Sequence, residues 1–299
     1  MTLAELEHRF PTEGDCKRFL VERRWPNGVR CPRCDNAKVV KLKRPWSWLC
    51  RACDKRGYRF SPLVGTIFEN TNYPLRTWFK VAYLMATAKK GISALHIQRI
   101  IGCGSYKTAW YMCHRLRAAM KQGGMFNPPK LSGEVEVDET FIGGKAKNRH
   151  GRGIGGGKKK GEGGTGKMGK VGVIGAIARK GNIVCQVIER VDAKTLERFV
   201  AATVSDDVSL VATDEYVGYK HLRAAGIPHE TVSHTKGEYV RGNVHTANLD
   251  SFWSLLKRGV VGTFHKVSKD HLPLYLNEFS FRHNHRKDPE IFEAIIDGA

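Results

Sequence analysis

The chain has 299 residues and is strongly basic, with 50 Lys and Arg against 29 Asp and Glu and a formal net charge of +21. Such a charge favours a polyanionic partner, most commonly nucleic acid, although a ribosomal or nonspecifically adhesive surface has a similar composition. No stretch of 18 apolar residues predicts a membrane span, and the opening MTLAELEHRF is unlike a signal peptide. We therefore expect a cytoplasmic protein that begins with a helical opener over residues 1–25.

Two Cys-x-x-Cys pairs follow the opener, Cys31 with Cys34 and Cys50 with Cys53. A two-residue gap lets both sulfurs of a pair converge on one point, and four such ligands suit one structural Zn²⁺ ion. The residues between the pairs indicate two short strands, so we predict a zinc ribbon over residues 26–70. Disulfides or redox thiols are the alternative, but they require an oxidising compartment or a thioredoxin-like setting.

Residues 71–126 have the apolar spacing of helices. From Leu75 one helix is predicted to run to about residue 90, and Ser93 and Ser105 can cap two more. Three helices with a Gly-containing turn before a basic last helix favour a helix-turn-helix module, whose final helix enters a DNA groove. An ordinary helical bundle is the alternative. The cations expected to face outward from the last helix and contact DNA are Lys107, Arg115 and Arg117.

The sequence NPPK at 127–130 marks a boundary, beyond which the apolar period becomes that of strands. Three strands, a helix, a fourth strand, a possible fifth strand and an amphipathic helix follow in that order. This order resembles the ribonuclease H-like fold. We therefore predict an α/β multidomain protein whose mixed sheet with helices occupies residues 130–299.

Residues 143–170 form an insert rich in Gly and Lys, which cannot bury much apolar area. Within it, GEGGTGKM has the glycine and lysine spacing of a P-loop, but Met168 stands where a Ser or Thr should meet Mg²⁺. A basic flap over DNA phosphates is favoured, with a solvated hairpin loop as the alternative. The DNA-contacting candidates of this flap are Lys158, Lys159 and Lys160.

Three carboxylates are expected to converge at one end of the predicted sheet. Asp138 is predicted to end its first strand and Asp214 its fourth, while Asp250 lies near the start of the late helix. Three such acids repel one another unless cations lie between them, and oxygen ligands suit two Mg²⁺ or Mn²⁺ ions that catalyse phosphodiester displacement. Glu139 and Glu215 are alternative ligands, but successive strand residues face opposite sides, so only one of each adjacent pair can point into the site.

The late helix has a polar face that carries Asp250, Ser254, Lys257 and Arg258. A carboxylate followed by cations on one face suits a metal site beside a phosphate backbone, so Lys257 and Arg258 are further DNA-contact candidates. An acid in a first helical turn can instead merely complement the helix dipole.

Several motifs together resemble bacterial insertion-sequence transposases of the DDE type with an N-terminal zinc ribbon. The resemblance implies that Asp138, Asp214 and Asp250 are the catalytic triad, that Mg²⁺ is the cofactor and that the ribbon and helical region recognise double-stranded DNA at the element's ends. A homo-oligomer acting on end and target DNA is the corresponding expectation. The motifs are RWPNGVRCPRC, CRAC, GTIFENTNYPLRTW, VEVDETFIGG, ATDEYVGY, VHTANLDSFWSLLKRGVVGTFHKVS and YLNEFSFRHNHR.

One position departs from this family's usual pattern, because Asp250 stands where Glu is usual. Asn248 and Glu278 are the fallback candidates for the third ligand. Three functions follow: a transposase that cleaves and joins strands, a DNA-binding descendant without chemistry, and a metal-dependent structure-specific nuclease.

Overall fold

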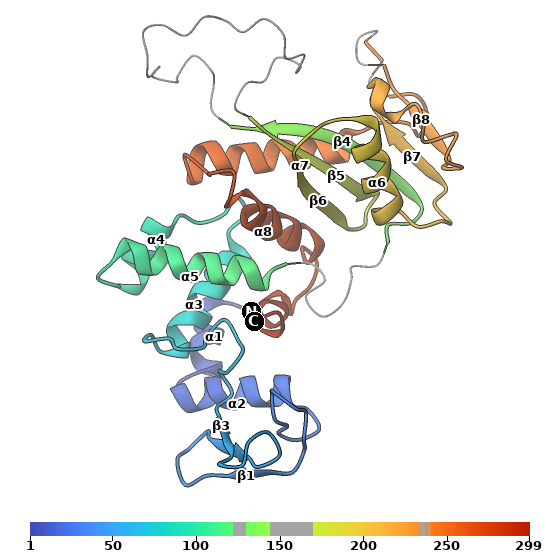
Figure 1. Ribbon diagram of the computed structural model, residues 1–299. Coiled ribbons are helices and arrows are strands. Elements are labelled where there is room, and N and C mark those ends of the chain that lie inside the picture. Colours follow the sequence, from blue (N-terminus) through green and yellow to red (C-terminus); the bar gives the residue numbers. More distant parts are fainter. Residues whose placement is uncertain (122–129, 144–169, 234–236, 239) are drawn as a thin grey trace, which may run out of the picture. The chain divides into compact units, whose positions relative to one another are not determined.

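The computed structural model in Figure 1 describes residues 1–121, 130–143, 170–233, 237–238 and 240–299. The chain forms two compact units. Unit 1 contains residues 1–125 together with 285–299, and unit 2 contains residues 126–284. The sequence predicts one domain from 130 to 299, whereas the last fifteen residues belong to unit 1.

Unit 1 opens with two short helices, α1 (Leu3–Arg9) and α2 (Glu13–Arg24). Each begins with a capping box, in which Thr2 or Thr12 accepts a hydrogen bond from the third helical N–H while the acid there accepts one in return. The predicted helical opener is therefore a pair of helices. Caps matter here because helices this short are marginal without them.

The core of unit 1 explains why the C-terminal residues join it. Helix α9 (Ile291–Asp297) brings Phe292 against Phe79 of α3 (Leu75–Thr87), with ring centroids 5.4 Å apart. Phe10 lies 4.9 Å from Phe79 in the same cluster. Edge-to-face aromatic packing of this kind adds to the burial of apolar area. The amphipathic C-terminal segment is thus paired with helices from the start of the chain.

Helices α4 (Ala94–Ile101) and α5 (Tyr106–Ala119) follow α3 as predicted. Ser93 accepts a hydrogen bond from His96 N–H, and Gly102 ends α4 in the left-handed conformation at φ 65°. The prediction that Arg117 faces outward is wrong, because its side chain is only 2% exposed. It follows Cys113 by four residues and therefore lies on the buried stripe of α5.

The zinc-ribbon region contains a three-stranded antiparallel sheet. Its strands are β1 (Val39–Lys41), β2 (Trp48–Cys50) and β3 (Tyr58–Phe60). The first two agree with the predicted strands, and β3 was not predicted. Trp48 and Phe60 stack across the sheet with centroids 5.9 Å apart, giving the small sheet an apolar face.

Unit 2 is built on a five-stranded mixed sheet in the order β6-β5-β4-β7-β8. The central strand β4 is antiparallel to β5 and parallel to β7, and β7 is parallel to β8. The neighbouring positions of β4 and β7, the first and fourth strands of this unit, agree with the predicted ribonuclease H-like sheet. The strands are β4 (Glu134–Ile142), β5 (Val171–Ala178), β6 (Ile183–Ile188), β7 (Leu210–Thr213) and β8 (His229–Thr231).

Helices cover both faces of this sheet (Figure 1). Helix α6 (Ala193–Thr203) packs on the face that carries Val135 and Val137. Helices α7 (Ala247–Arg258) and α8 (Leu272–Asn284) pack on the other face. Because side chains alternate along a strand, Glu136 and Asp138 point toward α7.

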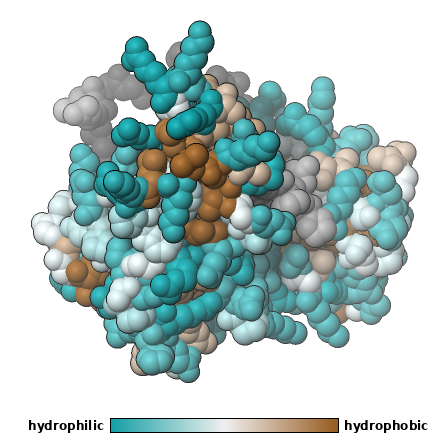
Figure 2. Space-filling view, turned by 90° about the horizontal axis from the view of Figure 1, so that it is seen from below, coloured by the Kyte–Doolittle hydropathy of each residue, from teal (hydrophilic) through white to brown (hydrophobic). Residues whose placement is uncertain are grey.

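A short helix over Val217–Tyr219 follows β7, and a π-helical turn, Gly259–Thr263, follows α7. Hydrophilic residues cover most of the face shown in Figure 2, with a hydrophobic patch among them. Of the helices in the described ranges, none has the length and apolar character needed to span a membrane.

Candidate active site and zinc site

The four cysteines of the ribbon converge as their spacing predicts. Their sulfur atoms all lie within 4.8 Å of one another. Cys31 Sγ is 3.4 Å from Cys53 Sγ, and Cys34 Sγ is 3.7 Å from Cys50 Sγ, so each close pair joins the two motifs. Strand β2 supplies Cys50, the turn before β1 supplies Cys31 and Cys34, and the loop between β2 and β3 supplies Cys53.

The thiols strongly influence one another's protonation. Burial raises the pKa of Cys31, but the N–H groups of Arg33 and Cys34 and the neighbouring thiols oppose it and bring it down to about 7. Hydrogen bonds with Cys34 and Cys31 raise the pKa of Cys53. Four sulfur ligands around one point, with no position left for water, fit a structural zinc ion.

The first candidate carboxylate, Asp138, lies in the middle of β4 and not at its end. The prediction of its place in the strand was wrong because β4 continues along β5 as far as Ile142, whereas β7 pairs only with the beginning of β4. The last β4–β7 pair is Glu136 with Ala212. Asp138 lies two residues beyond Glu136, and Asp214 lies two residues beyond Ala212, just after the end of β7.

The two faces of β4 separate Asp138 from its neighbour Glu139. Trp253 Nε1 of α7 donates a hydrogen bond to Asp138 Oδ2 at 2.9 Å. Tyr219 donates its hydroxyl to Glu139 Oε2 at 2.7 Å on the other face of the sheet. The side chain of Asp138, and not that of Glu139, therefore faces the helix that carries Asp250.

Asp214 directly follows β7, and its Oδ1 accepts a hydrogen bond from Tyr216 N–H at 3.0 Å. Glu215 is exposed and accepts a hydrogen bond from the hydroxyl of Ser233. Asp250 is exposed in the first turn of α7, where Thr246 Oγ1 donates to its Oδ2 at 3.2 Å.

Burial and the surrounding negative charges raise the pKa of Asp138 to about 7. The charges responsible are those of Glu139, Asp214 and Asp250, in decreasing order. Asp214, just after β7, and Asp250 of α7 thus both lie near enough to Asp138 to raise its pKa. Carboxylate oxygens are hard donors that suit divalent cations such as Mg²⁺ or Mn²⁺.

Gly175 is a feature of this site that the sequence reasoning missed. It pairs with Asp138 across β4 and β5. A Cβ atom at this position would lie 2.8 Å from two ring carbons of Trp253. The absence of a side chain therefore gives the indole the space in which it reaches Asp138. A glycine inside a strand was the available signal, since it often marks a close approach.

Glu136 was also missed. It is fully buried and accepts hydrogen bonds from the first turn of α7, including one from Asn248 Nδ2 at 2.7 Å. Asn248, a fallback candidate for the third ligand, thus directs its side chain to Glu136. The other fallback, Glu278, is fully buried and forms an ion pair with Arg282 of the same helix. The geometry favours Asp250 over both.

Comparison with known proteins identifies the family. Residues 130–284 match the ISXO2-like transposase domain, which is more than half of the chain. The chain belongs to the ISXO2-like transposase family. Residues 11–56 match the transposase zinc-ribbon domain, which together with the cysteine cluster supports a structural zinc site in this family member.

A curated relative covers nearly the whole chain. It is described as an uncharacterized protein in the transposable element ISH50 of Halobacterium salinarum. The two sequences are 29% identical over an alignment of 303 positions, which covers 97% of this chain and 98% of the relative. The likeness thus extends over both units of this ISXO2-like transposase family member and supports a transposase function.

The predicted DNA-contacting cations of this family member differ in their surroundings. Lys107 is exposed, as are Lys257 and Arg258 at the end of α7. Arg115 is half-buried, with its guanidinium 5.4 Å from the centre of the Tyr111 ring. The candidates of the Gly- and Lys-rich insert, Lys158, Lys159 and Lys160, lie outside the described residues.

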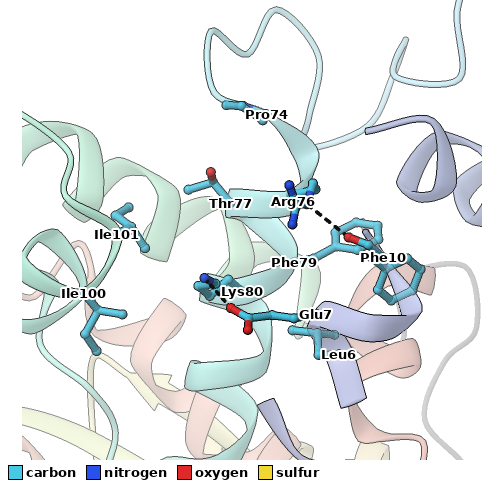
Figure 3. Close-up of a pocket in the computed structure, with 10 residues that line it drawn as sticks. All are labelled: Leu6, Glu7, Phe10, Pro74, Arg76, Thr77, Phe79, Lys80, Ile100 and Ile101. Carbon is cyan, nitrogen blue, oxygen red and sulfur yellow. Dashed lines mark hydrogen bonds and ion pairs between the residues drawn. The ribbon is translucent and has the colours of Figure 1, made fainter. Parts of the chain in front are cut away.

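A pocket in unit 1 of this family member is lined by none of the candidate metal-binding or DNA-contacting residues (Figure 3). Its charged side chains are already paired: Lys80 Nζ is 2.7 Å from Glu7 Oε1, and Arg76 Nε donates to the carbonyl of Phe10 at 3.1 Å. Figure 3 shows Glu7 and Lys80 pointing toward one another. The remainder of the lining is mainly apolar, so the pocket presents no catalytic constellation.

Proposed function

We propose that this protein is a transposase of the DDE type. It binds the ends of its mobile element and carries out DNA strand cleavage and strand transfer with Mg²⁺ or Mn²⁺. The observation that carries the proposal is the position of Asp138 on β4 facing α7, with Asp214 and Asp250 near enough for their charges to raise its pKa, within a transposase-family domain.

Two divalent cations held by these aspartates would activate the attacking oxygen and stabilise the leaving oxygen in phosphodiester displacement. The chain's own residues orient the ligands. Trp253 fixes one oxygen of Asp138, and Thr246 fixes one oxygen of Asp250. These tethers limit the rotation of both carboxylates before any cation binds, which reduces the reorganisation that binding requires.

DNA binding is assigned to basic residues outside the three aspartates. Lys257 and Arg258 lie on the same helix as Asp250 and would contact the phosphate backbone near the reacting strand. The zinc ribbon and the helices α3 to α5, with Lys107 and Arg115, would bind the element's ends, and the insert with Lys158 to Lys160 would add nonspecific affinity. A homo-oligomer on DNA would bring two ends together. Binding should weaken steeply with salt, because phosphate contacts release counterions.

The test measures Mg²⁺-dependent nicking and joining of element-end DNA. Asp138→Ala, Asp214→Ala and Asp250→Ala should each lower activity by roughly a thousandfold or more while end binding remains, because the DNA-binding regions are unchanged. Asp207→Ala is a matched control that removes an exposed carboxylate outside the site. Binding without nicking by the wild type would indicate a DNA-binding descendant, and nicking without joining would indicate a nuclease.

Asp250→Glu tests the departure from the usual family residue. The longer acid should be tolerated if α7 leaves room for it. If the site is closed around the shorter acid, the shift of about 1.5 Å should reduce strand transfer on the order of a hundredfold. Near-normal strand transfer by Asp250→Ala would contradict the assignment of this residue.

A further inference from the structure

Glu136 is a buried acid that the proposed chemistry does not use. It precedes Asp138 by two residues on β4, so both side chains leave the strand on the α7 face. Its side chain is fully buried. A buried carboxylate is tolerated only when its oxygens are paired, so its partners indicate its role.

Two of those partners, Asn248 and Leu249, lie in the first turn of α7. Glu136 Oε2 accepts hydrogen bonds from the backbone N–H of Asn248 at 2.9 Å and of Leu249 at 3.1 Å. Oε1 accepts one from Asn248 Nδ2 at 2.7 Å. The first N–H groups of a helix have no partner within the helix, and a negative charge there also complements the helix dipole. Glu136 therefore caps α7 from another element.

The same carboxylate also helps to hold the segment that leads into α7. His245 Nδ1 lies 3.1 Å from Glu136 Oε1, and Arg179 Nε lies 3.3 Å from it. Arg179 also forms an ion pair with Glu134 and donates a hydrogen bond to the carbonyl of Asn243. The segment from Asn243 to Leu249 is thus held to the central strand by a charged network.

A second tether joins the same strand and helix. Trp253 Nε1 donates to Asp138 Oδ2, so bonds to Glu136 and Asp138 hold α7 on both sides of Asp250. Two strand residues span about 6.6 Å, and the four helical residues from Leu249 to Trp253 rise about 6 Å. These similar spacings let both bonds form in one register. A slip of α7 by one turn, about 5.4 Å, would break both.

We infer that Glu136 is a positioning residue that sets where Asp250 stands relative to Asp138 and Asp214. This inference rests on the proposed function, because it assigns Asp250 to a shared cation site. Glu136 itself does not contact the cation or the DNA. It fixes the start of α7, and Asp250 follows directly after the two tethered N–H groups.

The experiment measures Mn²⁺ binding to the full-length protein without DNA by calorimetry, together with hydrogen exchange of the backbone amides in residues 247–252. Glu136→Gln keeps the shape but presents an NH₂ group to partners that are themselves donors. We expect faster amide exchange and at least fivefold weaker Mn²⁺ binding. Leu256→Val is the matched control, since it alters the buried side of the same helix six residues beyond Asp250, and Mn²⁺ affinity should stay unchanged.

A double-mutant cycle separates positioning from general destabilisation. In an Asp250→Ala background, adding Glu136→Gln should leave the residual Mn²⁺ affinity unaltered, because the effect is transmitted through Asp250. Asn248→Ala is a milder variant for the case in which Glu136→Gln does not fold. It removes only the side-chain bond to Glu136 and should weaken Mn²⁺ binding about twofold, again only when Asp250 is present.

The outcomes distinguish this inference from the proposed function. Unchanged Mn²⁺ affinity in Glu136→Gln, or an equal loss with and without Asp250, would overturn the positioning role alone. Mn²⁺ binding by the wild type that Asp138→Ala does not reduce would overturn the proposed cation site and this inference together.

Discussion

The cysteine cluster and the three aspartates bring like groups together in different ways. The four thiols come from residues 31–53, and a small three-stranded sheet holds them within 4.8 Å of one another. The aspartates are residues 138, 214 and 250, which lie on a strand, directly after a neighbouring strand and on a helix of a much larger unit. The apolar core of the ribbon consists of a few aromatic and aliphatic side chains. The sheet that carries Asp138 in unit 2 has an extensive apolar core on each of its two faces.

This difference indicates what each cluster depends on. In the ribbon, the zinc ion supplies folding free energy that a small apolar core cannot provide. In unit 2, the core and the tethers on α7 hold the aspartates together at an electrostatic cost. A cation is therefore expected to be structural in the first case and to be required only for chemistry in the second.

The largest expected effect is the response of the ribbon to losing a ligand. Cys34→Ser should reduce the zinc content from about one ion per chain and unfold the ribbon, because structural zinc contributes on the order of 10 kcal/mol to such domains. Metal analysis and tryptophan fluorescence would measure this. Cys103→Ser, outside the ribbon, is the control and should retain zinc. A folded ribbon in the metal-free wild type would contradict the comparison.

Removing a charge from the aspartates should raise the stability of unit 2, whereas removing a zinc ligand should lower the stability of the ribbon. Burial and neighbouring acids raise the pKa of Asp138 from 3.8 to about 7, so its stabilising contribution is present below pH 4 and is lost as the pH rises through 7. In metal-free protein at pH 8, Asp138→Asn should therefore stabilise unit 2 by on the order of 3 kcal/mol. Urea unfolding would measure the gain, with Asp207→Asn as the control.

If Asp138→Asn is no more stable than the wild type at pH 8, the aspartates are not under electrostatic repulsion. The same samples test the cation. Added Mn²⁺ should raise the melting temperature of the wild type and have little effect on Asp138→Asn.

Acid should lower the stability of unit 2 through the protonation of His229. Burial, followed by the charge of Arg223, lowers the pKa of His229 from 6.5 to about 4, while His229 Nε2 lies 2.8 Å from Thr213 Oγ1. The stabilising contribution of the neutral ring is present above pH 6.5 and is lost as the pH falls toward 4. Between pH 7 and 4.5 this should remove about 2 kcal/mol.

His229→Gln should reduce the pH dependence of urea unfolding between pH 7 and 4.5. The exposed His221→Gln is the control and should preserve it. An identical acid response in His229→Gln would assign the loss of stability to other groups.

The smallest expected effect concerns the packing of the Trp253 ring beside Asp138. Gly175→Ala places a Cβ within 2.8 Å of the Trp253 ring, so the ring must shift. Overpacking of this kind should cost about 1–2 kcal/mol. The hydrogen bond to Asp138 should weaken as well, which thermal unfolding and the Mg²⁺ dependence of nicking would detect. Gly262→Ala, with open space around it, is the control. An unchanged Mg²⁺ dependence would show that the indole does not orient Asp138.

The features that could be predicted from the sequence depend on near neighbours. The cysteine spacing predicted the cluster because each ligand pair is set by a two-residue turn. The helix start at Ser93 and the end at Gly102 follow from groups within three residues of each cap. The adjacency of the first and fourth strands of the large sheet was also expected, but from resemblance to a known fold and not from pairing preferences.

The features that could not be predicted depend on distant partners. Glu136 and Asn248 are 112 positions apart, and Asp138 and Trp253 are 115 apart. Strand alternation limited the choice to Asp138 or Glu139, and only the position of α7 shows which of them faces the helix. Arg117 was misplaced for a related reason, since its charge suggested exposure while its helical position lies on the buried stripe.

Unit 1 is built from two segments that are far apart in the chain, and this has a consequence for the folding of the protein during its synthesis. Phe292 completes an aromatic cluster with Phe10 and Phe79, yet about 160 residues separate the two segments of this unit in the chain. At translation rates of about 5–20 residues per second, the N-terminal segment waits roughly 10–30 s for its last packing partner. On a ribosome, unit 2 therefore has the opportunity to fold first, and the proposed DNA-binding surface of unit 1 matures only when α9 emerges.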